Sequence, residues 1–427
     1  MVASDSADSV AHWFARRRFG LFLHFGIYAV NGWHEQDRMR RRIQRADYEK
    51  LADAFDPHAW NPDAILDLAE AAGMEYVCLT TKHHDGFCLW DTAETAFNSM
   101  AACGRDLVDE LAEACHRRDF ALGLYYSIAD WHHPAYPNQG RHHELAGHEP
   151  ADQPDWDAYV AYVRAQVEEL ATGYGRIRHW FWDINVPEHR DPSINARLRE
   201  LQPGIVINDR GFDDGDFSTP EREYQADETG RVWRFDRLTE ACNSLGTQSW
   251  GFRRDEAYYS TSFLCRSIDA IHARGGHYLL NTGPMPDGSI APRDRVLLSK
   301  IGNWYRAVRE AFGEAEPASH LTTSREVLLT RRGERTLYVH VPAPLKSDLV
   351  VLPPIDQLPD HVTMLNTGES LEARVELLPP HWQTGGRYLN LRGWDTEALA
   401  AETLVIRLDF PEPLREAREV TAKAFQG

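Results

Sequence analysis

Two acidic residues in this sequence occupy positions where a carboxylate could do chemistry. Asp183 lies near the end of the largely apolar segment WFWDINVP. A carboxylate there is costly unless it is hydrogen-bonded or functional, and a functional one acts as nucleophile, acid or base. The alternative is a cap for the next element, and we favour the functional interpretation. For Glu221, in GDFSTPE, the sequence favours neither a catalytic role nor a solvated position in a loop.

Three histidines form a second group near the ends of apolar runs. They are His24 in FLHFG, and His83 and His84 in TKHHDGF. Imidazoles are common zinc ligands, but these residues lack an HxH pair, an HExxH helix or a cysteine partner. We therefore expect neutral imidazoles that hydrogen-bond ligand hydroxyls. The 13 tryptophans agree with a sugar ligand, because a flat apolar ring stacks well on the C–H face of a sugar.

Short apolar runs rich in β-branched and aromatic residues must position these groups. They predict buried strands at 19–26, 76–84, 121–127, 179–184, 204–210, 224–229, 247–252 and 276–284. Between them lie helical patterns at 61–74, 105–118, 155–175 and 293–312, the first with Asn61 as N-cap and Pro62 at its start. About eight strand–helix repeats favour a (β/α)8 barrel over a doubly wound sheet.

Polar residues cluster near the carboxyl ends of the predicted strands, where barrel enzymes build their active sites. The set is His24, His83, His84, Asp183, Asn208, Asp209, Arg210, Trp250 and Asn281. Arg210 could be a structural ion-pair partner or could orient a ligand hydroxyl. In GLYYS, Tyr125 and Tyr126 fall on opposite faces of a strand, so only one can face the barrel interior.

The pattern changes after about residue 317. Short strands with polar turns at 325–341, 347–354 and 402–410 indicate a small antiparallel β-domain. We therefore predict an α/β protein with a barrel over residues 1–316 and a β-domain over 317–427.

Composition excludes several functions. Lys+Arg 46 against Asp+Glu 65 gives a net charge of −19 in 427 residues, which disfavours nucleic acid and an anionic membrane surface as partners. No run approaches the ~18 apolar residues of a membrane-spanning helix. The first 20 residues lack the apolar core of a signal peptide, so we expect a cytoplasmic protein.

Eight motifs in order carry a family resemblance over residues 13–312. They are WFARRRFGLFLHFGIY, YVCLTTKHHDGFCLW, LGLYYSIADWHHP, WFWDINVP, VINDRG, TPE, EACNSLGTQSWGF and HYLLNTGPMPDGSI. The sequence resembles the α-L-fucosidases of glycoside hydrolase family 29. That resemblance implies a (β/α)8-like barrel followed by a β-sandwich. It also implies exo-acting, retaining hydrolysis of terminal α-L-fucosyl residues through a covalent glycosyl-enzyme, with no metal and no other cofactor.

The resemblance also implies residue roles. Asp183 matches the family nucleophile, and Glu221 matches an acid/base whose position varies within the family. Trp250 matches an aromatic residue that packs against the C5 methyl group of fucose. The full set of matched substrate contacts is His24, Glu35, His83, His84, Tyr125, Phe181, Arg210 and Trp250.

Three positions depart from the family pattern. Phe181 replaces a tryptophan two residues before the nucleophile, Gln36 follows Glu35 where the family usually has tryptophan, and Thr239 replaces another tryptophan. Because of these changes, the sequence does not establish the preferred leaving group or the exact sugar. The expected partner is a fucosylated glycoside or oligosaccharide, and the sequence does not decide whether the protein is a homo-oligomer. A metal-dependent barrel hydrolase using the three histidines and Asp183, and a catalytically silent sugar-binding protein, are the alternatives.

Overall fold

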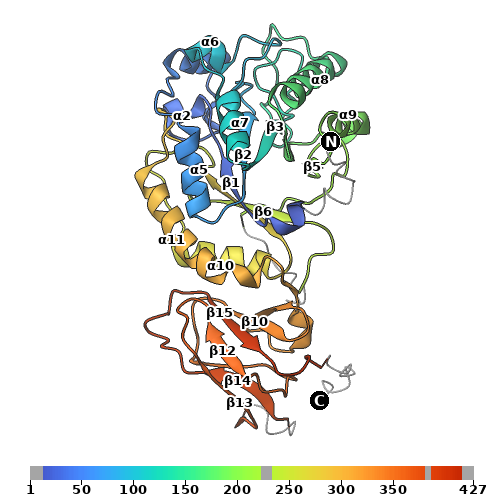
Figure 1. Cartoon of the computed structure of the whole chain (residues 1–427). Helices are drawn as coiled ribbons and strands as arrows, with labels where there is room; N and C mark the ends of the chain where they lie inside the picture. The colour runs from blue at the N-terminus through green and yellow to red at the C-terminus, as the bar shows by residue number, and fades with distance from the viewer. Residues whose placement is uncertain (1–12, 223–232, 380–385, 416–427) are drawn as a thin grey trace. The chain divides into compact units, whose positions relative to one another are not determined.

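The computed structural model describes residues 13–222, 233–379 and 386–415 (Figure 1). Its first part is a sheet of parallel strands in the order β5-β4-β3-β2-β1-β7-β6. The strands are β1 (Phe19–Leu23), β2 (Tyr76–Lys82), β3 (Ala121–Ser127), β4 (His179–Asp183), β5 (Val206–Ile207), β6 (Glu240–Ser244) and β7 (His277–Thr282). They are almost completely buried, as their apolar sequences predict.

The segment from Phe217 to Glu221 joins the two edge strands of this sheet. It forms parallel bridges from Phe217 to Asn208, from Ser218 to Thr239 and from Glu221 to Cys242. Backbone hydrogen bonds support the bridges, including Cys242 N to Pro220 O at 3.0 Å. The segment therefore completes a barrel-like ring, and the predicted (β/α)8-like class is confirmed.

Four helices begin close to where the sequence predicts, namely α5 (Pro62–Ala71), α7 (Leu107–Arg117), α8 (Trp156–Gly173) and α11 (Pro292–Val308). Two further helices, α9 (Pro192–Leu201) and α10 (Thr261–His272), are not among the predicted ones. The Asn61 side chain accepts a hydrogen bond from Ala64 N at 3.1 Å, with Pro62 at the first position, as predicted. Such a cap contributes roughly 1 kcal/mol to helix stability. Helix α5 packs beside α7, and α8 beside α9.

Residues 247–252 do not form a strand, and that prediction is wrong; the strand is β6, slightly earlier in the chain. Its sequence EACNS is too polar to read as a buried strand, yet all five residues are buried. The predicted strand at 224–229 lies outside the described residues.

The second part of the chain is a β-sandwich with antiparallel strands. One sheet has the order β12-β15-β10-β9-β8 and the other β11-β14-β13. The strands are β8 (Glu316–Pro317), β9 (Leu328–Arg332), β10 (Thr336–Val341), β11 (Leu349–Val351), β12 (His361–Met364), β13 (Glu372–Glu376), β14 (Tyr388–Arg392) and β15 (Leu404–Asp409). Residues of both sheets share one apolar core, which includes Val339, Val350, Leu391 and Ile406. The predicted β-sandwich is confirmed.

Contacts divide the chain into two compact units. The first contains the parallel sheet, and the second contains the antiparallel strands together with α10. The chain therefore passes between the units more than once, whereas the sequence suggested a single boundary after residue 316. The domain limits stay a prediction. No helix in the described part of the chain is long and apolar enough to cross a membrane.

Candidate active site

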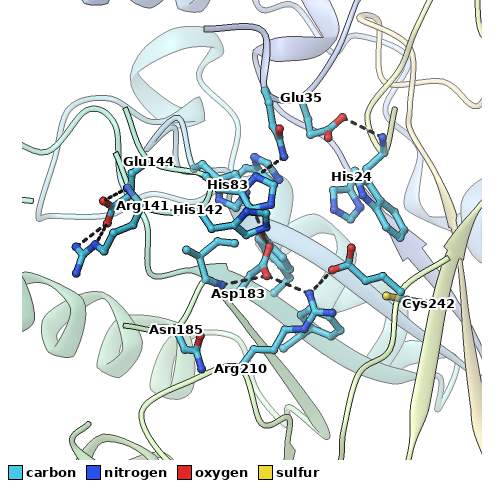
Figure 2. Close-up of a pocket in the computed structure, with 18 of the residues that line it drawn as sticks. His24, Glu35, His83, Arg141, His142, Glu144, Asp183, Asn185, Arg210 and Cys242 are labelled. Atoms are coloured by element: carbon cyan, nitrogen blue, oxygen red, sulfur yellow. Dashed lines mark hydrogen bonds and ion pairs between the residues drawn. The ribbon is translucent and has the colours of Figure 1, made fainter. Parts of the chain in front are cut away.

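All ten residues matched by the resemblance line one pocket of about 550 Å³. The pocket lies where the carboxyl ends of β1, β2, β3 and β4 meet, which is the functional rim of a barrel. Figure 2 shows Asp183 and Arg210 near its centre, with His24 and Cys242 to one side. The predicted residues in the pocket are His24, Glu35, His83, His84, Tyr125, Phe181, Asp183, Arg210, Glu221 and Trp250.

Asp183 is the last residue of β4, and three groups hold its carboxylate. The hydroxyl of Tyr125 donates a 2.7 Å hydrogen bond to Oδ2, and the backbone N–H of Ile184 donates one of 3.0 Å to Oδ1. Nη1 of Arg210 lies 3.3 Å from Oδ1. The carboxylate is thereby fixed, and its side chain keeps 13% exposure toward the pocket.

The ionised form of Asp183 is stabilised despite its burial. Burial alone would raise the pKa of this carboxyl, but Arg210, His84 and the Tyr125 hydroxyl hold the pKa below its ordinary value. The interpretation of Asp183 as a helix cap is wrong, because the next helical turn, η2 (Pro187–His189), has Val186 as its N-cap and no side-chain cap. A carboxylate that stays ionised at neutral pH and faces a pocket is suited to nucleophilic attack.

Arg210 joins the two acidic residues. Its Nη1 contacts Asp183 Oδ1 and also Glu221 Oε1, and its Nη2 donates to the backbone oxygen of Thr219. One nitrogen in contact with both oxygens places them at most about 6.5 Å apart, the sum of two such contacts. The carboxyls of retaining glycosidases are ~5–5.5 Å apart, so the arrangement is compatible with that class.

Glu221 reaches the pocket from the segment that closes the barrel. Its backbone bridges to Cys242 of β6, and Arg222 N donates to Cys242 O at 2.7 Å. The side chain is 42% exposed and is paired with Arg210. Glu221 is therefore not an isolated solvated loop residue.

His24 presents a hydrogen-bond acceptor to the pocket. Its Nδ1 lies 2.7 Å from Asn281 Oδ1, while the Asn281 amide nitrogen donates to Trp250 O and Ser244 Oγ. These partners assign the proton to Nδ1 of His24 and leave Nε2 unprotonated. Burial lowers the pKa of His24 to about 4, so the ring is neutral at neutral pH.

His84 is held in the same tautomer. The Ser127 hydroxyl donates to Ala129 O at 2.8 Å and therefore accepts from His84 Nδ1 at 2.7 Å. Nε2 of His84 is then an acceptor, 3.9 Å from Asp183 Oδ2. Burial lowers the pKa of His84 to about 3, which keeps this nitrogen unprotonated.

His83 packs between these residues rather than ligating with them. Its ring stacks on Tyr125 at 5.7 Å and 10°, and burial lowers its pKa well below the ordinary value. Within the residues that the structure describes, no three His, Cys, Asp or Glu side chains are arranged to hold a metal ion. The three histidines line the pocket as neutral rings.

Glu35 and Trp250 form one wall of the pocket. Oε2 of Glu35 accepts hydrogen bonds from Ser249 Oγ at 2.7 Å and from Trp250 N at 2.9 Å. The Trp250 ring stacks on His24 at 5.3 Å and 25°, with the guanidinium of Arg222 4.9 Å from its centre. Glu35 therefore fixes the aromatic wall, although it lies more than 200 residues away in sequence.

Aromatic rings form the pocket floor. Phe181 stacks on Tyr125 at 5.7 Å and 23°, and lies 5.2 Å from Phe22. Tyr126 lies on the other face of β3, where its hydroxyl donates to Gln166 at 2.7 Å. The alternation predicted for GLYYS is correct, and Tyr125 is the residue that faces inward.

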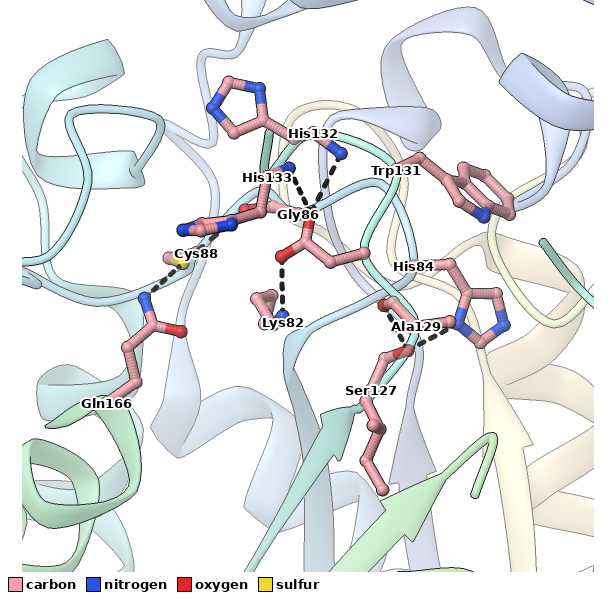
Figure 3. A network of polar contacts seen from close by, with 12 residues as sticks. Lys82, His84, Gly86, Cys88, Ser127, Ala129, Trp131, His132, His133 and Gln166 are labelled. Atoms are coloured by element: carbon pink, nitrogen blue, oxygen red, sulfur yellow. Dashed lines mark hydrogen bonds and ion pairs between the residues drawn. The ribbon is translucent and has the colours of Figure 1, made fainter. Parts of the chain in front are cut away.

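A buried ion pair supports the histidine loop. Lys82 Nζ lies 2.8 Å from Asp130 Oδ2, both side chains are fully buried, and Lys82 also donates to the Tyr159 hydroxyl at 3.2 Å. The neighbouring Trp131 N donates to His84 O at 2.7 Å. Figure 3 shows Lys82 and His84 in this network. The pair therefore ties the end of β2 to the loop after β3, on the side of the sheet where Lys82 packs against Tyr126.

Sequence reasoning missed part of the pocket lining. The unpredicted residues are Phe22, Gln36, Arg141, His142, His143, Glu144, Ile184, Asn185, Val186, Glu188 and Cys242. Four of them come from the loop between β3 and α8, which the sequence marks only by its many His and Pro residues. That composition predicts that residues 130–152 shape the leaving-group side of the pocket, but the places of the individual residues depend on contacts with distant segments.

A barrel rim that carries two converging carboxylates, neutral imidazoles and an aromatic wall is typical of a glycoside hydrolase. Residues 1–310 match the family described as Alpha-L-fucosidase. The chain belongs to the alpha-L-fucosidase family.

Similar proteins agree with this assignment. The chain is 27% identical over 387 residues to the tissue alpha-L-fucosidase of Homo sapiens, covering 83% of this chain and 80% of that protein. Alpha-L-fucosidase isoenzyme 1 from Paenibacillus thiaminolyticus has a TM-score of 0.83 and 29% identity, covering 95% of this chain and 100% of that one. The Thermotoga maritima alpha-fucosidase bound to a mechanism-based inhibitor has a TM-score of 0.72 and 26% identity, covering 94% and 98%.

Proposed function

We propose that the protein is an exo-acting, retaining α-L-fucosidase that removes terminal α-L-fucosyl residues from glycosides or oligosaccharides. The observation that carries this proposal is the contact of one Arg210 nitrogen with carboxylate oxygens of both Asp183 and Glu221. It gives the pocket the paired acids that double displacement requires. Membership of the alpha-L-fucosidase family indicates that the sugar is fucose.

In the first step, Asp183 Oδ attacks C1 of the fucosyl residue while the bond from C1 to the leaving oxygen breaks. Glu221 donates its proton to that oxygen, so that a neutral alcohol departs. Arg210 contacts Oε1 of Glu221, so Oε2 is the oxygen that would carry the proton. In the second step, Glu221 takes a proton from water, and the hydroxide oxygen replaces Asp183 at C1.

Pocket residues assist as positive charge develops on the sugar ring. Tyr125 and Arg210 keep Asp183 ionised and oriented before attack. The unprotonated Nε2 atoms of His24 and His84 accept hydrogen bonds from sugar hydroxyls. Trp250 offers an apolar surface for the methyl group that distinguishes fucose from galactose, because a C–H group packs well on an indole face.

Hydrolysis of an aryl α-L-fucoside, followed by proton NMR, tests the proposal. We expect turnover with the α-anomer as the first product, since two displacements restore the configuration. A panel of other aryl glycosides should react more slowly. A first-formed β-anomer, or no turnover of the fucoside, would contradict the proposed activity. Defined fucosyl oligosaccharides would then establish the linkage preference.

A further inference from the structure

His143 is a pocket residue to which the family resemblance gives no role. It lies in the loop between β3 and α8, is half-buried, and adopts a φ of +61°, which is uncommon for a residue other than glycine. Its backbone oxygen accepts a 2.8 Å hydrogen bond from Trp131 Nε1. An unfavourable backbone conformation fixed by a buried indole indicates that the ring position is specified.

Gln36 sets the tautomer of the His143 ring. Arg40 Nε donates to Gln36 Oε1 at 2.9 Å, which identifies the oxygen of the Gln36 amide. The other amide atom, Nε2, therefore donates to His143 Nδ1 at 2.8 Å. Nδ1 is then the acceptor of the ring, and the proton of the neutral imidazole is on Nε2. Burial and the neighbouring His142 lower the pKa of His143, so the ring stays neutral.

The loop that carries His143 is organised in advance by Glu144. This buried carboxylate accepts hydrogen bonds from the Tyr136 hydroxyl at 2.7 Å, from Arg141 Nε at 2.8 Å and from Gln139 N at 3.0 Å. Figure 2 shows Glu144 joined to Arg141 at the side of the pocket. Binding a ligand against this wall requires little ordering of the loop, which favours affinity.

His143 and His84 have opposite hydrogen-bonding character. Their ring centres are 5.5 Å apart, and both rings line the pocket. His84 Nε2 is an acceptor 3.9 Å from Asp183 Oδ2, whereas His143 Nε2 is a donor. A sugar hydroxyl can donate one hydrogen bond and accept another, so such a pair satisfies it fully. With Asp183 attacking C1, the nearest hydroxyl of the sugar is the one on C2.

We propose that His143 binds the 2-hydroxyl of the sugar by donating a hydrogen bond from Nε2, and that Gln36 is the positioning residue that fixes this tautomer. The proposal rests on the proposed fucosidase activity. His143 is then a specificity residue, and its tautomer depends on the glutamine at position 36, where the family usually has tryptophan.

Kinetics of His143→Phe on two substrates test the proposal. The substrates are an aryl α-L-fucoside and its 2-deoxy analogue. With the fucoside, we expect kcat/KM to fall roughly tenfold or more, because the variant leaves a hydroxyl without its donor. With the 2-deoxy substrate, the same variant should change kcat/KM less than about twofold, since the contact is already missing. Equal losses on both substrates, or no loss on either, would overturn the proposal.

Two further variants separate hydrogen bonding from packing. His143→Gln can place an amide donor near the position of Nε2 and should recover much of the lost kcat/KM on the fucoside. His148→Phe, an exposed histidine on the same loop, should behave as wild type on both substrates. No recovery with glutamine would point to a packing role and contradict the assignment. If the wild-type protein did not hydrolyse the fucoside, the proposed function itself would fail, which is a distinct result.

The tautomer can be measured without relying on a variant that folds poorly. In the ¹⁵N spectrum of histidine-labelled full-length protein, we expect His143 Nδ1 at the position of an unprotonated ring nitrogen and Nε2 at that of a protonated one. Gln36→Glu places a carboxylate acceptor opposite Nδ1 and should move the proton to that atom. The same variant should lose discrimination for the 2-hydroxyl while retaining the His143 ring. A proton on Nδ1 in the wild-type protein would contradict the proposal.

Discussion

Glu221 lies opposite Cys242 in a parallel β-bridge, and this pairing brings a loop carboxylate to the rim of the barrel. The backbone of the closing segment, rather than a helix or a long strand, therefore determines where this acid is located. Asp183, in contrast, ends a strand with partners on both sides. The two acids thus depend on different parts of the fold, and each can be tested separately.

Replacing Glu221 should affect substrates according to their leaving groups. For Glu221→Ala, we expect kcat/KM to fall roughly 10²–10⁴-fold with poor leaving groups, which need a proton. The loss should be small for an activated aryl fucoside, whose phenolate departs unaided. The measurement is a plot of rate against leaving-group pKa. Glu188→Ala, which removes a 70% exposed carboxylate from the same pocket, should leave the slope of that plot unchanged.

Removing the nucleophile should stop the reaction in a way that a small anion can reverse. We expect Asp183→Gly to lower turnover of an aryl α-L-fucoside about 10⁴-fold or more. Azide fits the space left by the carboxylate and should restore part of the rate, giving a β-fucosyl azide that NMR can identify. Full activity of the variant without azide would refute the nucleophile assignment.

The Tyr125 hydroxyl should control the acidic limit of activity. It helps to keep the pKa of Asp183 below its ordinary value, together with Arg210 and His84 and against the effect of burial. Tyr125→Phe therefore raises that pKa. The acid limb of the pH profile of kcat/KM, where Asp183 becomes protonated, should move to higher pH.

Tyr126→Phe is the matched control for this measurement. It removes the neighbouring hydroxyl, which faces Gln166 on the other side of the strand. Its acid limb should coincide with that of the wild type. A shift of the same size in both variants would show that the effect is not transmitted through Asp183.

Buried neutral histidines should make the protein less stable at acidic pH. Burial lowers the pKa of His24 to about 4, of His84 to about 3 and of His277 to about 4. The unfolded chain binds these protons near pH 6.5, while the folded chain does not. The contribution of these neutral histidines to the free energy of unfolding is therefore fully present above about pH 6.5. It falls as the pH decreases toward 4, by up to about 1.4 kcal/mol per pH unit for each histidine.

Unfolding experiments across this pH range can measure the effect. His277 lies outside the pocket, with Nε2 2.6 Å from Phe14 O, so His277→Gln leaves the site unaltered. We expect this variant to show a shallower loss of stability between pH 6.5 and 4 than the wild type. Equal slopes in the wild type and in His277→Gln would contradict the assigned contribution of His277.

The ion pair of Lys82 and Asp130 should be necessary for a stable pocket. Both side chains are fully buried, so Lys82→Met leaves the Asp130 carboxylate without its countercharge. We expect the free energy of unfolding to fall by roughly 3–5 kcal/mol. Lys50→Met breaks an exposed pair with Asp47 and should leave the free energy of unfolding almost unchanged. Similar small losses from both variants in denaturant titrations would contradict the assigned importance of the buried pair.

The sequence predicts most strands of the barrel because they are short apolar runs with no competing pattern. Strand β6 is the exception. It contains Glu240, whose burial becomes acceptable only because Tyr76 donates a 2.5 Å hydrogen bond to it and His179 lies 3.0 Å away. Both partners come from other strands. A local pattern cannot reveal a polar residue that is satisfied by distant ones.

The residues of the candidate site also differ in whether the sequence alone reveals them. Residues at strand ends, such as His24 and Asp183, are visible in the sequence because polar groups interrupt apolar runs. His143 is not visible, since its position depends on Gln36, 107 residues earlier, and on the backbone of its own loop. Sequence patterns thus identify the nucleophile strand, while the opposite wall of the pocket becomes apparent only in three dimensions.

The five-residue segment that closes the barrel has an evolutionary consequence. It is attached through isolated bridges to Asn208, Thr239 and Cys242, and a short connection joins it to the segment that ends at Arg210. Insertions or deletions in that connection could relocate the proton donor along the rim while β4 and its nucleophile stay in place. Chemistry at the sugar and selectivity for the departing alcohol could therefore diversify independently during descent from a common ancestor.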